Sequence, residues 1–562
     1  MYRFLSLTTL LFYFNCSFAQ IKITIPDTLS GKIIDLTIAK GVKEFVEGKT
    51  AHTIGYNGNY LGNTIILHKG QNVKFNVYNN LTEPTSTHWH GLHVSPANDG
   101  SPHNPIMPNE VWSPEFTVMD NAATYWYHPH LHEKTLKQVV KGAAGLIIVR
   151  DSAEESLNLP RTYGKDDFPL ALQFLTLDET GDIVEDDEAD NTIMVNGTIN
   201  GELDCPAELI RLRLLNASSH RVFNLGFENN MIFHQICGDA GLLQKPVRLT
   251  RLILGPGERA EVIVNLTNRD GELIKINQYG NELPIGFPGG PPMGMAGNMM
   301  QGPLDNKITS IMTLKVIQGS GSLNTLPSYL TTLENLPISN FNRNFGITAQ
   351  PMMSMTNFFI NNKKFDMEEI NFKSKLGATE TWIITNQTMM AHPFHVHGNH
   401  FFITEINGQA PAENLTGRKD VVLIPPMNGN VKLVTTFSDF SNSDVPYMYH
   451  CHILSHEDNG MMGQFLIENT TTKVLETTNE LALMVNNPFT NKLNISGNSI
   501  PDKFVTFLRI ISIDGKQVFQ TSIKDNNFNF DVETTQWSKG VFILNFIDSN
   551  QNILLSKQVV KM

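Results

Sequence analysis

The residues with the clearest chemistry are histidines that recur two positions apart. The spacing His-x-His occurs in THWHG (87–91), YWYHPHLH (125–132) and HPFHVHG (392–398), and HCHILSHEDNGMM (450–462) adds a cysteine and two methionines. In an extended strand, residues i and i+2 point to one face about 6–7 Å apart. One such pair arises easily by chance, whereas four pairs in two distant parts of the chain predict a shared metal centre.

The elements that must position these histidines are short β-strands. Runs of Val, Ile, Leu, Phe and Thr alternate with Gly, Pro, Asn and Asp, as in NTIILHKGQNVKFNVYNN (63–80), RLRLLNASSHRVFNLGF (211–227) and ETWIITNQT (380–388). Convincing long amphipathic helices are absent. The pattern predicts an all-β chain of sandwich type.

The strand-like runs fall into three weakly similar blocks followed by a smaller one. We place the blocks at 20–150, 160–319 and 341–469, and the smaller block at 486–562 after a polar linker, 470–485. Within the smaller block, Asp514-Gly515 predicts a hairpin turn. The Gly/Pro/Met tract GFPGGPPMGMAGNMMQGP (286–303) has no period of a helix or strand and is predicted to be a loop.

Composition and the N-terminus narrow the class of protein. The 562 residues carry a formal net charge of −13, which argues against a nucleic-acid partner. Residues 1–19 combine an early Arg3 with a short apolar run and predict a secretory signal. A lipid anchor at Cys16 is the disfavoured alternative, because Asn15 precedes it. No transmembrane segment is expected, because no run reaches about 18 apolar residues.

Removal of the signal leaves three cysteines. Cys205 and Cys237 could form a disulfide in an oxidising compartment, and the sequence leaves this open. Cys451 stands among histidines, where a bound metal would protect its thiol.

The four histidine motifs, in this order, resemble those of the three-domain multicopper oxidases. GYNGNYLGNTIILHKG (55–70), LGPGERAEVIVN (254–265) and MMAHPFHVHG (389–398) resemble the bacterial branch with cuprous oxidases, laccases and bilirubin oxidases. The likeness covers about residues 25–468 and implies three consecutive cupredoxin-like (Greek-key β-sandwich) domains.

The C-terminal block resembles the sorting domain of type IX secretion. This implies a protein that is secreted or held at the cell surface after passage through the periplasm, with the type IX machinery as a partner. The alternative is a small β-domain that binds something at the cell surface.

The resemblance also implies four copper ions. The implied type 1 ligands are His392, Cys451 and His456 with Met461 axial, and the type 2 ligands are His88 and His395. The implied type 3 pair is held by His90, His128 and His452 on one ion and by His130, His397 and His450 on the other. A His2Cys site with a weak Met ligand suits one-electron transfer. The implied reaction oxidises a donor one electron at a time and reduces O2 to water.

Two carboxylates match positions thought to relay protons in the family, Asp99 and Glu457. The alternatives are an Asp-Gly turn for Asp99 and a solvated loop charge for Glu457. His132 matches a position that binds no metal, and we expect it to make a hydrogen bond near the site. The remaining histidines are interpreted as structural: His52, His68, His93, His103, His220, His234 and His400.

The sequence leaves the electron donor open. Met293, Met295, Met299 and Met300 in the loop, with a second group at 352–355, offer thioethers that select Cu(I) and favour copper tolerance. Methionines that fill a core are the alternative. In some relatives a carboxylate four positions before the first type 1 histidine receives the metal, but here that residue is Thr388. Oxidation of phenols or aryl amines, or of bilirubin, therefore stays open.

Other classes of function are alternatives to an oxidase. The main alternative is a non-enzymatic, copper-sequestering cupredoxin protein of the cell envelope. Proteins of this fold that have lost their ligands and serve structural or division roles are disfavoured by the complete ligand set. Copper nitrite reductases lack the eight-histidine cluster and rank last.

Overall fold

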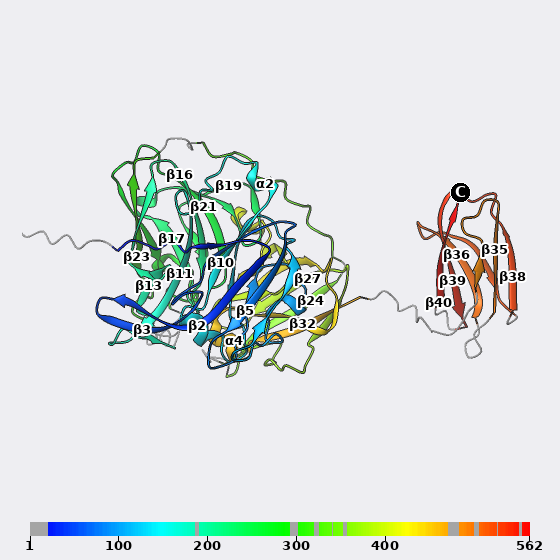
Figure 1. The fold of residues 1–562 in the computed structure, drawn as a ribbon, viewed down its shortest axis with the longest axis horizontal. Coiled ribbons are helices and arrows are strands. Elements are labelled where there is room, and N and C mark those ends of the chain that lie inside the picture. Colours follow the sequence, from blue (N-terminus) through cyan, green and yellow to red (C-terminus); the bar gives the residue numbers. More distant parts are fainter. Residues whose placement is uncertain are drawn as a thin grey trace, which may run out of the picture. The chain divides into compact units, whose positions relative to one another are not determined.

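Strands are the main regular structure in both compact units of the computed structural model, Met1–Glu468 and Asn469–Met562 (Figure 1). The structure describes residues 21–185, 190–292, 302–319, 325–339, 341–351, 357–469, 483–498, 505–524, 527–549 and 553–562. The predicted signal, residues 1–19, and residues 470–482 of the predicted linker lie outside them. The predicted all-β fold class is confirmed.

The first sandwich of the larger unit pairs two sheets over one apolar core. One sheet has the order β1-β4-β10-β9-β6, and the other has the order β3-β2-β5-β7 with β8 also on β5. Leu36, Phe75, Trp89 and Ile147 lie in the core. The strands are β1 (Thr28–Leu29), β2 (Ile33–Val46), β3 (Lys49–Tyr56), β4 (Thr64–His68), β5 (Asn72–Asn79), β6 (His88–His90), β7 (Val111–Trp112), β8 (Glu115–Thr117), β9 (Ala123–His128) and β10 (Gly145–Arg150).

The second sandwich contains a strand whose alternating sequence is misleading. In β16, the pattern Ile-Arg-Leu-Arg-Leu (210–214) suggests one exposed face, but every residue is buried. Arg211 pairs with Glu154 and Glu261, and Arg213 pairs with Asp167 and Glu261. Both faces of this strand are therefore covered, one by apolar side chains and one by ion pairs.

The two sheets of this sandwich have the orders β14-β13-β11-β16-β21-β18-β19, with β12 on β11, and β15-β23-β22-β17-β20. Their strands are β11 (Asp167–Leu177), β12 (Ile183–Val184), β13 (Thr192–Val195), β14 (Thr198–Ile199), β15 (Glu202–Pro206), β16 (Leu209–Asn216), β17 (Phe223–Phe227), β18 (Phe233–Cys237), β19 (Leu242–Leu249), β20 (Leu252–Leu254), β21 (Arg259–Asn265), β22 (Leu273–Tyr279) and β23 (Ile308–Ile317).

The third sandwich follows the expected alternation more simply. In β27, buried residues alternate with less buried ones along the whole strand, and Trp382 and Ile384 enter the core. The sheet orders are β25-β24-β27-β31-β29 and β26-β33-β32-β28-β30. The strands are β24 (Asn342–Ala349), β25 (Phe358–Ile360), β26 (Phe372–Lys375), β27 (Thr379–Asn386), β28 (His392–Val396), β29 (Phe401–Ile406), β30 (Val421–Ile424), β31 (Gly429–Thr436), β32 (Asn442–Cys451) and β33 (Met462–Glu468).

The smaller unit is a sandwich with its own core, which includes Leu493, Leu508 and Leu544. Its sheets have the orders β34-β35-β38 and β37-β36-β39-β40. Gly515, at φ +84°, lies in the turn between β36 and β37, where the hairpin was predicted. The strands are β34 (Met484–Val485), β35 (Lys492–Asn498), β36 (Val505–Ser512), β37 (Gln517–Ser522), β38 (Asn527–Glu533), β39 (Gly540–Asp548) and β40 (Ile553–Lys561).

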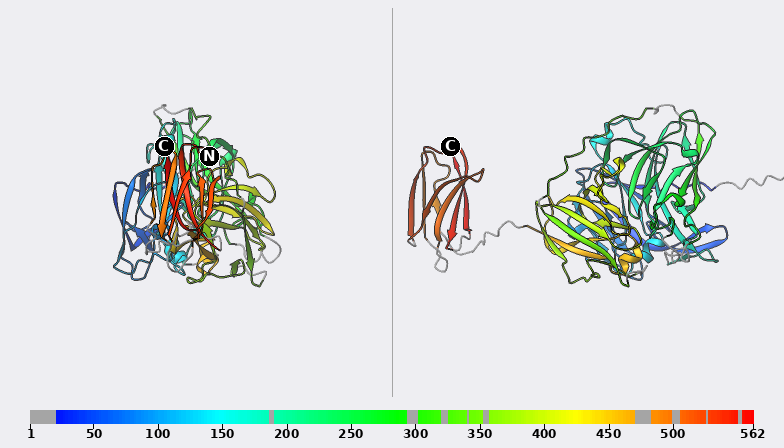
Figure 2. Two further views of the ribbon diagram at one scale, coloured as in Figure 1. Left: turned by 90° about the vertical axis from the view of Figure 1, so that its right-hand side faces the viewer. Right: turned by 180° about the vertical axis from the view of Figure 1, so that it is seen from behind.

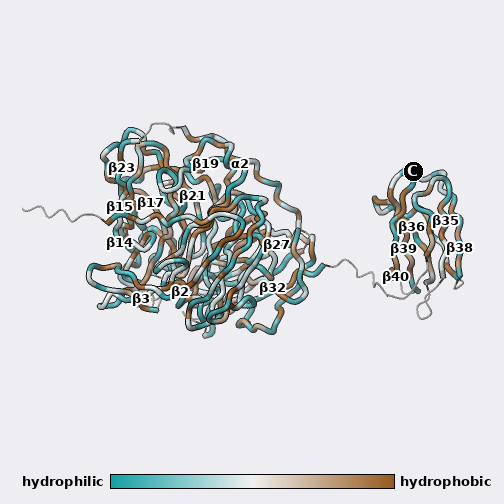
Figure 3. Tube along the Cα trace, in the orientation of Figure 1, coloured by the Kyte–Doolittle hydropathy of each residue, from teal (hydrophilic) through white to brown (hydrophobic). Residues whose placement is uncertain are grey.

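Helices are short throughout the described chain, as Figure 2 also shows. They are α1 (Thr135–Val140), α2 (Ser152–Glu155) and α4 (Leu454–Asp458), with 3-10 turns η1 (Pro96–Asn98), η2 (Glu228–Asn230), η3 (Gly280–Glu282) and η4 (Glu413–Leu415). None of the helices in the described residues has the length and hydropathy needed to cross a bilayer. Figure 3 shows apolar and polar residues interspersed along the strands instead.

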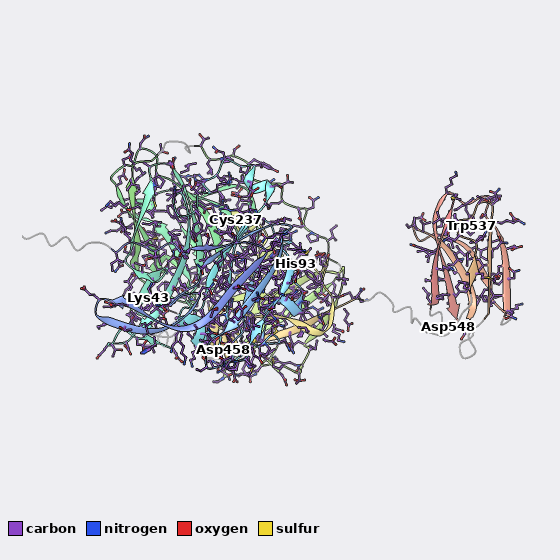
Figure 4. The ribbon with its side chains drawn as sticks, viewed as in Figure 1. Lys43, His93, Cys237, Asp458, Trp537 and Asp548 are labelled. Atoms are coloured by element: carbon purple, nitrogen blue, oxygen red, sulfur yellow. The ribbon has the colours of Figure 1, made fainter. Side chains whose placement is uncertain are left out.

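Cys205 and Cys237 are both free thiols and do not form the disulfide that the sequence left open. Cys205 lies in the core of the second sandwich, whereas Cys237, labelled in Figure 4, packs in the core of the first. Both side chains are buried, so each is enclosed by apolar neighbours without a partner sulfur.

Candidate metal centre

Four strand ends bring the predicted histidines of the first and third sandwiches together. In the first sandwich, β6 pairs with β9 so that His88 lies opposite His128. In the third, β28 pairs with β32 so that His395 lies opposite His450. His90 ends β6, and His130, His397 and His452 follow within two residues of the ends of β9, β28 and β32, so all of them enter the same buried space.

The eight histidines of this space fall into two clusters and a pair. In the first cluster, the Nε2 atoms of His130, His397 and His450 lie 3.0–3.1 Å from one another. In the second, His90 Nδ1 lies 3.4 Å from His128 Nε2 and 3.3 Å from His452 Nε2. His88 Nε2 and His395 Nε2 are 3.5 Å apart. The grouping is the one that the family resemblance implied.

Hydrogen bonds at the outer edges of the rings fix which nitrogen faces inward. Backbone carbonyls face Nδ1 of four histidines, and carboxylates face two more. The contacts are His88 to Asp99 O (2.8 Å), His395 to Asp420 O (2.8 Å), His128 to Pro129 O (2.8 Å), His450 to Cys451 O (3.0 Å), His397 to Asp99 Oδ2 (2.7 Å) and His90 Nε2 to Asp420 Oδ1 (3.1 Å).

Each of these outer nitrogens must carry the proton, because its partner is an acceptor. The inner nitrogens therefore present lone pairs to one another at about hydrogen-bonding distance with no proton between them. Such a set repels itself unless a cation is bound. The donor set fits copper, for which imidazole is a good ligand.

A second site lies on the other side of the same strand end. Cys451 Sγ is 3.5 Å from His392 Nδ1 and 3.6 Å from His456 Nδ1, and all three residues are buried. His456 lies on the short helix α4. Met461 is fully buried beside them, and its carbonyl accepts the N–H of Cys451 at 3.1 Å.

The comparisons with known proteins agree with this geometry. Models described as "Multicopper oxidase" match residues 37–154 and 339–471. A multicopper oxidase of Staphylococcus haemolyticus is 35% identical over 446 residues, which are 77% of this chain and 88% of the relative. The chain belongs to the multicopper oxidase family.

Two further relatives of this multicopper oxidase are informative. A solved laccase-like multicopper oxidase from an Ochrobactrum species is 32% identical, with a TM-score of 0.71, covering 79% of this chain and 100% of that one. Cell division protein FtsP of Photorhabdus laumondii is 31% identical over 78% of this chain and 90% of its own length. A "Secretion system C-terminal sorting domain" model matches residues 486–561.

The two predicted proton-relay carboxylates of this chain are both buried against the histidines. Asp99 is fully buried, and its Oδ2 accepts from His397 Nδ1. It also directly precedes Gly100, at φ +77°, so the Asp-Gly turn and the contact with the cluster coexist.

Glu457 is 1% exposed, which excludes the solvated loop charge. Its carboxylate oxygens lie 3.4 Å from His130 Nδ1 and 3.3 Å from His450 Nδ1. Burial, and then the adjacent Asp458, raise the pKa of Glu457 well above its usual value. Glu457 is therefore a carboxyl group of raised pKa beside two histidines of one cluster.

Asp458, labelled in Figure 4, connects α4 to the first sandwich. Its carboxylate accepts the backbone N–H groups of Thr135 (3.1 Å) and Leu136 (2.9 Å) at the start of α1. Burial raises the pKa of Asp458 to about 6. The contact fixes the helix that carries both His456 and Glu457.

Thr388 contacts the sulfur site directly. Its hydroxyl lies 2.9 Å from His392 Nε2, and its side chain is buried. This leaves Nδ1 of His392 free to face Cys451. The residue that replaces a carboxylate of some relatives thus orients a predicted ligand.

The prediction that His132 makes a hydrogen bond near the site is wrong. Its Nδ1 is buried without a hydrogen-bond partner among the described residues, and its ring packs edge-on against Phe365 at 5.2 Å between centroids. His132 is therefore a packing residue on the loop that follows His130.

Copper-free protein should lose stability as the pH falls below about 6.5. Burial lowers the pKa of His450 and His456 to about 3. The unfolded chain binds these protons from about pH 6.5, so the stabilising contribution is present above pH 6.5 and is lost towards pH 3. Each histidine contributes a slope of up to about 1.4 kcal/mol per pH unit. The check is the apparent melting temperature between pH 7.5 and 5.

Two variants make this test specific. His456→Asn should show a shallower fall than the wild type, because one buried titrating group is gone. His52→Gln changes an exposed histidine and should keep the wild-type slope. Parallel falls for all three proteins would contradict the assignment to the buried histidines.

Proposed function

We propose that this protein oxidises an electron donor at a type 1 copper site formed by His392, Cys451, His456 and Met461, and reduces O2 to water at a trinuclear site. The observation that carries the proposal is the set of eight buried histidines, six of which are held by hydrogen bonds so that a lone pair faces inward. Copper bound there would collect single electrons from a donor and deliver four of them to O2. His88 and His395 would hold the type 2 ion, and the two three-histidine clusters would hold the type 3 pair.

The backbone around Cys451 supports electron transfer between the two sites. His450 and His452 flank the cysteine and lie in different clusters, whereas the thiol faces His392 and His456. Cys451 is therefore bonded through the backbone directly to one ligand of each cluster. This supplies the shortest covalent path that the chain offers.

Proton supply is the second requirement of the proposed reaction. Asp99 orients His397 and lies 3.4 Å from His88, while Glu457 reaches His130 and His450. The two carboxylates therefore flank the first cluster and the pair. We assign both to proton delivery.

The C-terminal match indicates secretion or attachment at the cell surface through the type IX machinery. Together with the predicted signal, it supports passage through the periplasm. We propose domain limits of 20–150, 160–319 and 341–469, followed by the sorting domain from 486.

The similarity to FtsP keeps a non-enzymatic role in view, as does copper storage. The complete set of buried ligands favours catalysis over both. Copper-loaded protein should be blue and should consume O2 with a phenol or Cu(I) as donor. A blue protein without oxygen uptake would indicate storage, and a protein that binds no copper would indicate a structural role.

The donor is best sought among phenols and Cu(I). The Ochrobactrum relative has oxidase activity towards lignin model compounds and lignosulfonate. In this chain, the carbonyl of Gly286 accepts the N–H of Ala391 at 2.8 Å, so the segment leading into the methionine loop passes beside His392. Met293, Met295, Met299 and Met300 lie outside the described residues, as do Met352, Met353 and Met355.

Removing the thioethers of the loop should separate the two donors. Replacing Met293, Met295, Met299 and Met300 together by leucine keeps apolar bulk and should lower oxygen uptake with Cu(I), leaving uptake with a phenol unchanged. The flanking residues 286–292 stay unchanged in this variant, because the backbone N–H groups of Val222 and Asn306 donate to the carbonyls of Pro288 and Gly289. Met107→Leu, at a half-exposed methionine of the first sandwich, is the control. Equal Cu(I) oxidation in all variants would remove the loop from the reaction.

A further inference from the structure

Arg259, at the start of β21 in the second sandwich, reaches towards the histidine clusters although its sandwich supplies none of the predicted ligands. Its guanidinium is buried and donates two parallel hydrogen bonds to Asp420 of the third sandwich, Nη1 to Oδ1 at 2.6 Å and Nη2 to Oδ2 at 2.5 Å. A two-pronged arginine–carboxylate contact fixes the plane of the carboxylate as well as its distance.

Asp420 in turn holds histidines from both ligand-bearing sandwiches. Its Oδ1 lies 3.1 Å from Nε2 of His90, and its backbone carbonyl accepts from Nδ1 of His395 at 2.8 Å. His90 differs from the other clustered histidines with described outer bonds, because its Nε2 points outward and its Nδ1 inward. The carboxylate of Asp420 thus selects the nitrogen that His90 offers to the cluster.

Arg259 is itself fixed from several sides. Its Nε donates to the carbonyl of Thr124 at 3.0 Å, and its backbone N–H donates to Asp239 at 2.8 Å. Lys419 bridges Asp239 and Glu258 at 2.9 Å each, so the ion pairs continue behind the arginine. All of these groups are buried, and rotation of Arg259 would break several charge-assisted bonds at once.

The glycine after His90 provides room for this contact. A Cβ on Gly91 would lie 2.6 Å from both Arg259 Nη2 and Asp420 Oδ2, and the residue has φ +88°. A side chain there would push apart the arginine and the carboxylate. The chain thus keeps space for the Arg259–Asp420 contact directly beside a predicted ligand.

We propose that Arg259 is a positioning residue for the proposed trinuclear site: through Asp420 it sets the orientation of His90 and with it the binding of the ion shared by His90, His128 and His452. The inference rests on the proposed function. The second sandwich then has a role in the centre, because it holds together ligands from the other two.

The test is Arg259→Lys, which keeps the positive charge but removes the two-pronged contact. We expect the blue band of the type 1 site to remain, because no residue of that site touches Arg259. The copper held by His90 should bind about 10- to 100-fold more weakly, as is typical when a group that supports a metal-binding histidine is changed. In electron paramagnetic resonance, the spin-coupled copper pair should give way to an uncoupled, visible copper.

Two further variants complete the test. Arg213→Lys alters another buried arginine of the same sandwich, which pairs with Asp167 and Glu261 and touches no predicted ligand, and it should keep the coupled pair. Asp420→Asn keeps the size of the side chain and should lose the pair as Arg259→Lys does. If Arg259→Lys lacks the blue band and therefore has not folded, Asp420→Asn serves as the test in its place.

The outcomes separate the two proposals. A coupled pair with wild-type copper affinity in Arg259→Lys or in Asp420→Asn would overturn the positioning role. The same loss in Arg213→Lys would also overturn it, because the effect would then be general destabilisation. Wild-type protein that binds no coupled pair would instead overturn the proposed function itself.

Discussion

Replacing Cys451 with serine is expected to abolish the blue colour and to leave one copper ion fewer per chain. The thiolate is the soft ligand of the proposed type 1 site, and a serine hydroxyl does not replace it. Oxygen uptake with an external donor should fall by at least about 100-fold, since losing a direct ligand costs more than losing a supporting group. Visible absorption, copper analysis and oxygen electrode measurements check this.

A matched control separates loss of the site from loss of a buried thiol. Cys205→Ser makes the same atomic change at a fully buried cysteine in the second sandwich. It should keep the colour and the copper content. The eight histidines of the Cys451→Ser protein should still bind copper, and two of these ions should still form the spin-coupled pair. A Cys451→Ser protein that stays blue would contradict the proposed type 1 site.

Glu457→Gln is expected to slow oxygen reduction while leaving the reduction of the type 1 copper by a donor unchanged. Glutamine has the shape of the protonated acid, the form that the raised pKa of Glu457 favours. It cannot release a proton to the site. Loss of one proton-transfer group typically costs about 100- to 10,000-fold in rate. Anaerobic reduction of the blue band and reoxidation by O2 would be followed by stopped flow.

The control for this variant is Glu380→Gln in the same sandwich. Glu380 is buried and hydrogen-bonded to Arg343, Ser374 and Trp382, away from the histidines. It should show normal reoxidation after correction for folded protein. Unchanged reoxidation of Glu457→Gln, or an equal defect in Glu380→Gln, would rule out the proton role.

Local patterns in the chain were enough to predict much of the fold. In β27, buried and less buried residues alternate as the two-residue repeat of a strand requires, with Trp382 and Ile384 on the buried face, and the turn at Asp514-Gly515 joins β36 and β37. In β16, the alternation of apolar residues and arginines suggests an exposed face, although the strand is buried on both faces. An exposed face and an ion-paired buried face produce the same alternation in the sequence. Which of the two occurs depends on Glu154, Asp167 and Glu261, which lie on other segments.

The sequence by itself determined which side chains could lie together. His-x-His places two imidazoles on one face of a strand, and Cys451 between two histidines must face away from them. These relations depend only on the two-residue repeat of a strand. The resemblance to a known family then implied how the ligands group and which metal they hold, and the clusters found in the structure have that grouping.

Only the tertiary structure decided how the histidines are oriented. Asp420 and Arg259 are distant in sequence from His90, and no spacing relates them. His132 and Glu457 both lay beside predicted ligands, yet only Glu457 faces the clusters, because Asp458 fixes α4 against α1. Hydrogen-bond direction and burial depend on contacts between sandwiches, and those contacts exist only after the chain has folded.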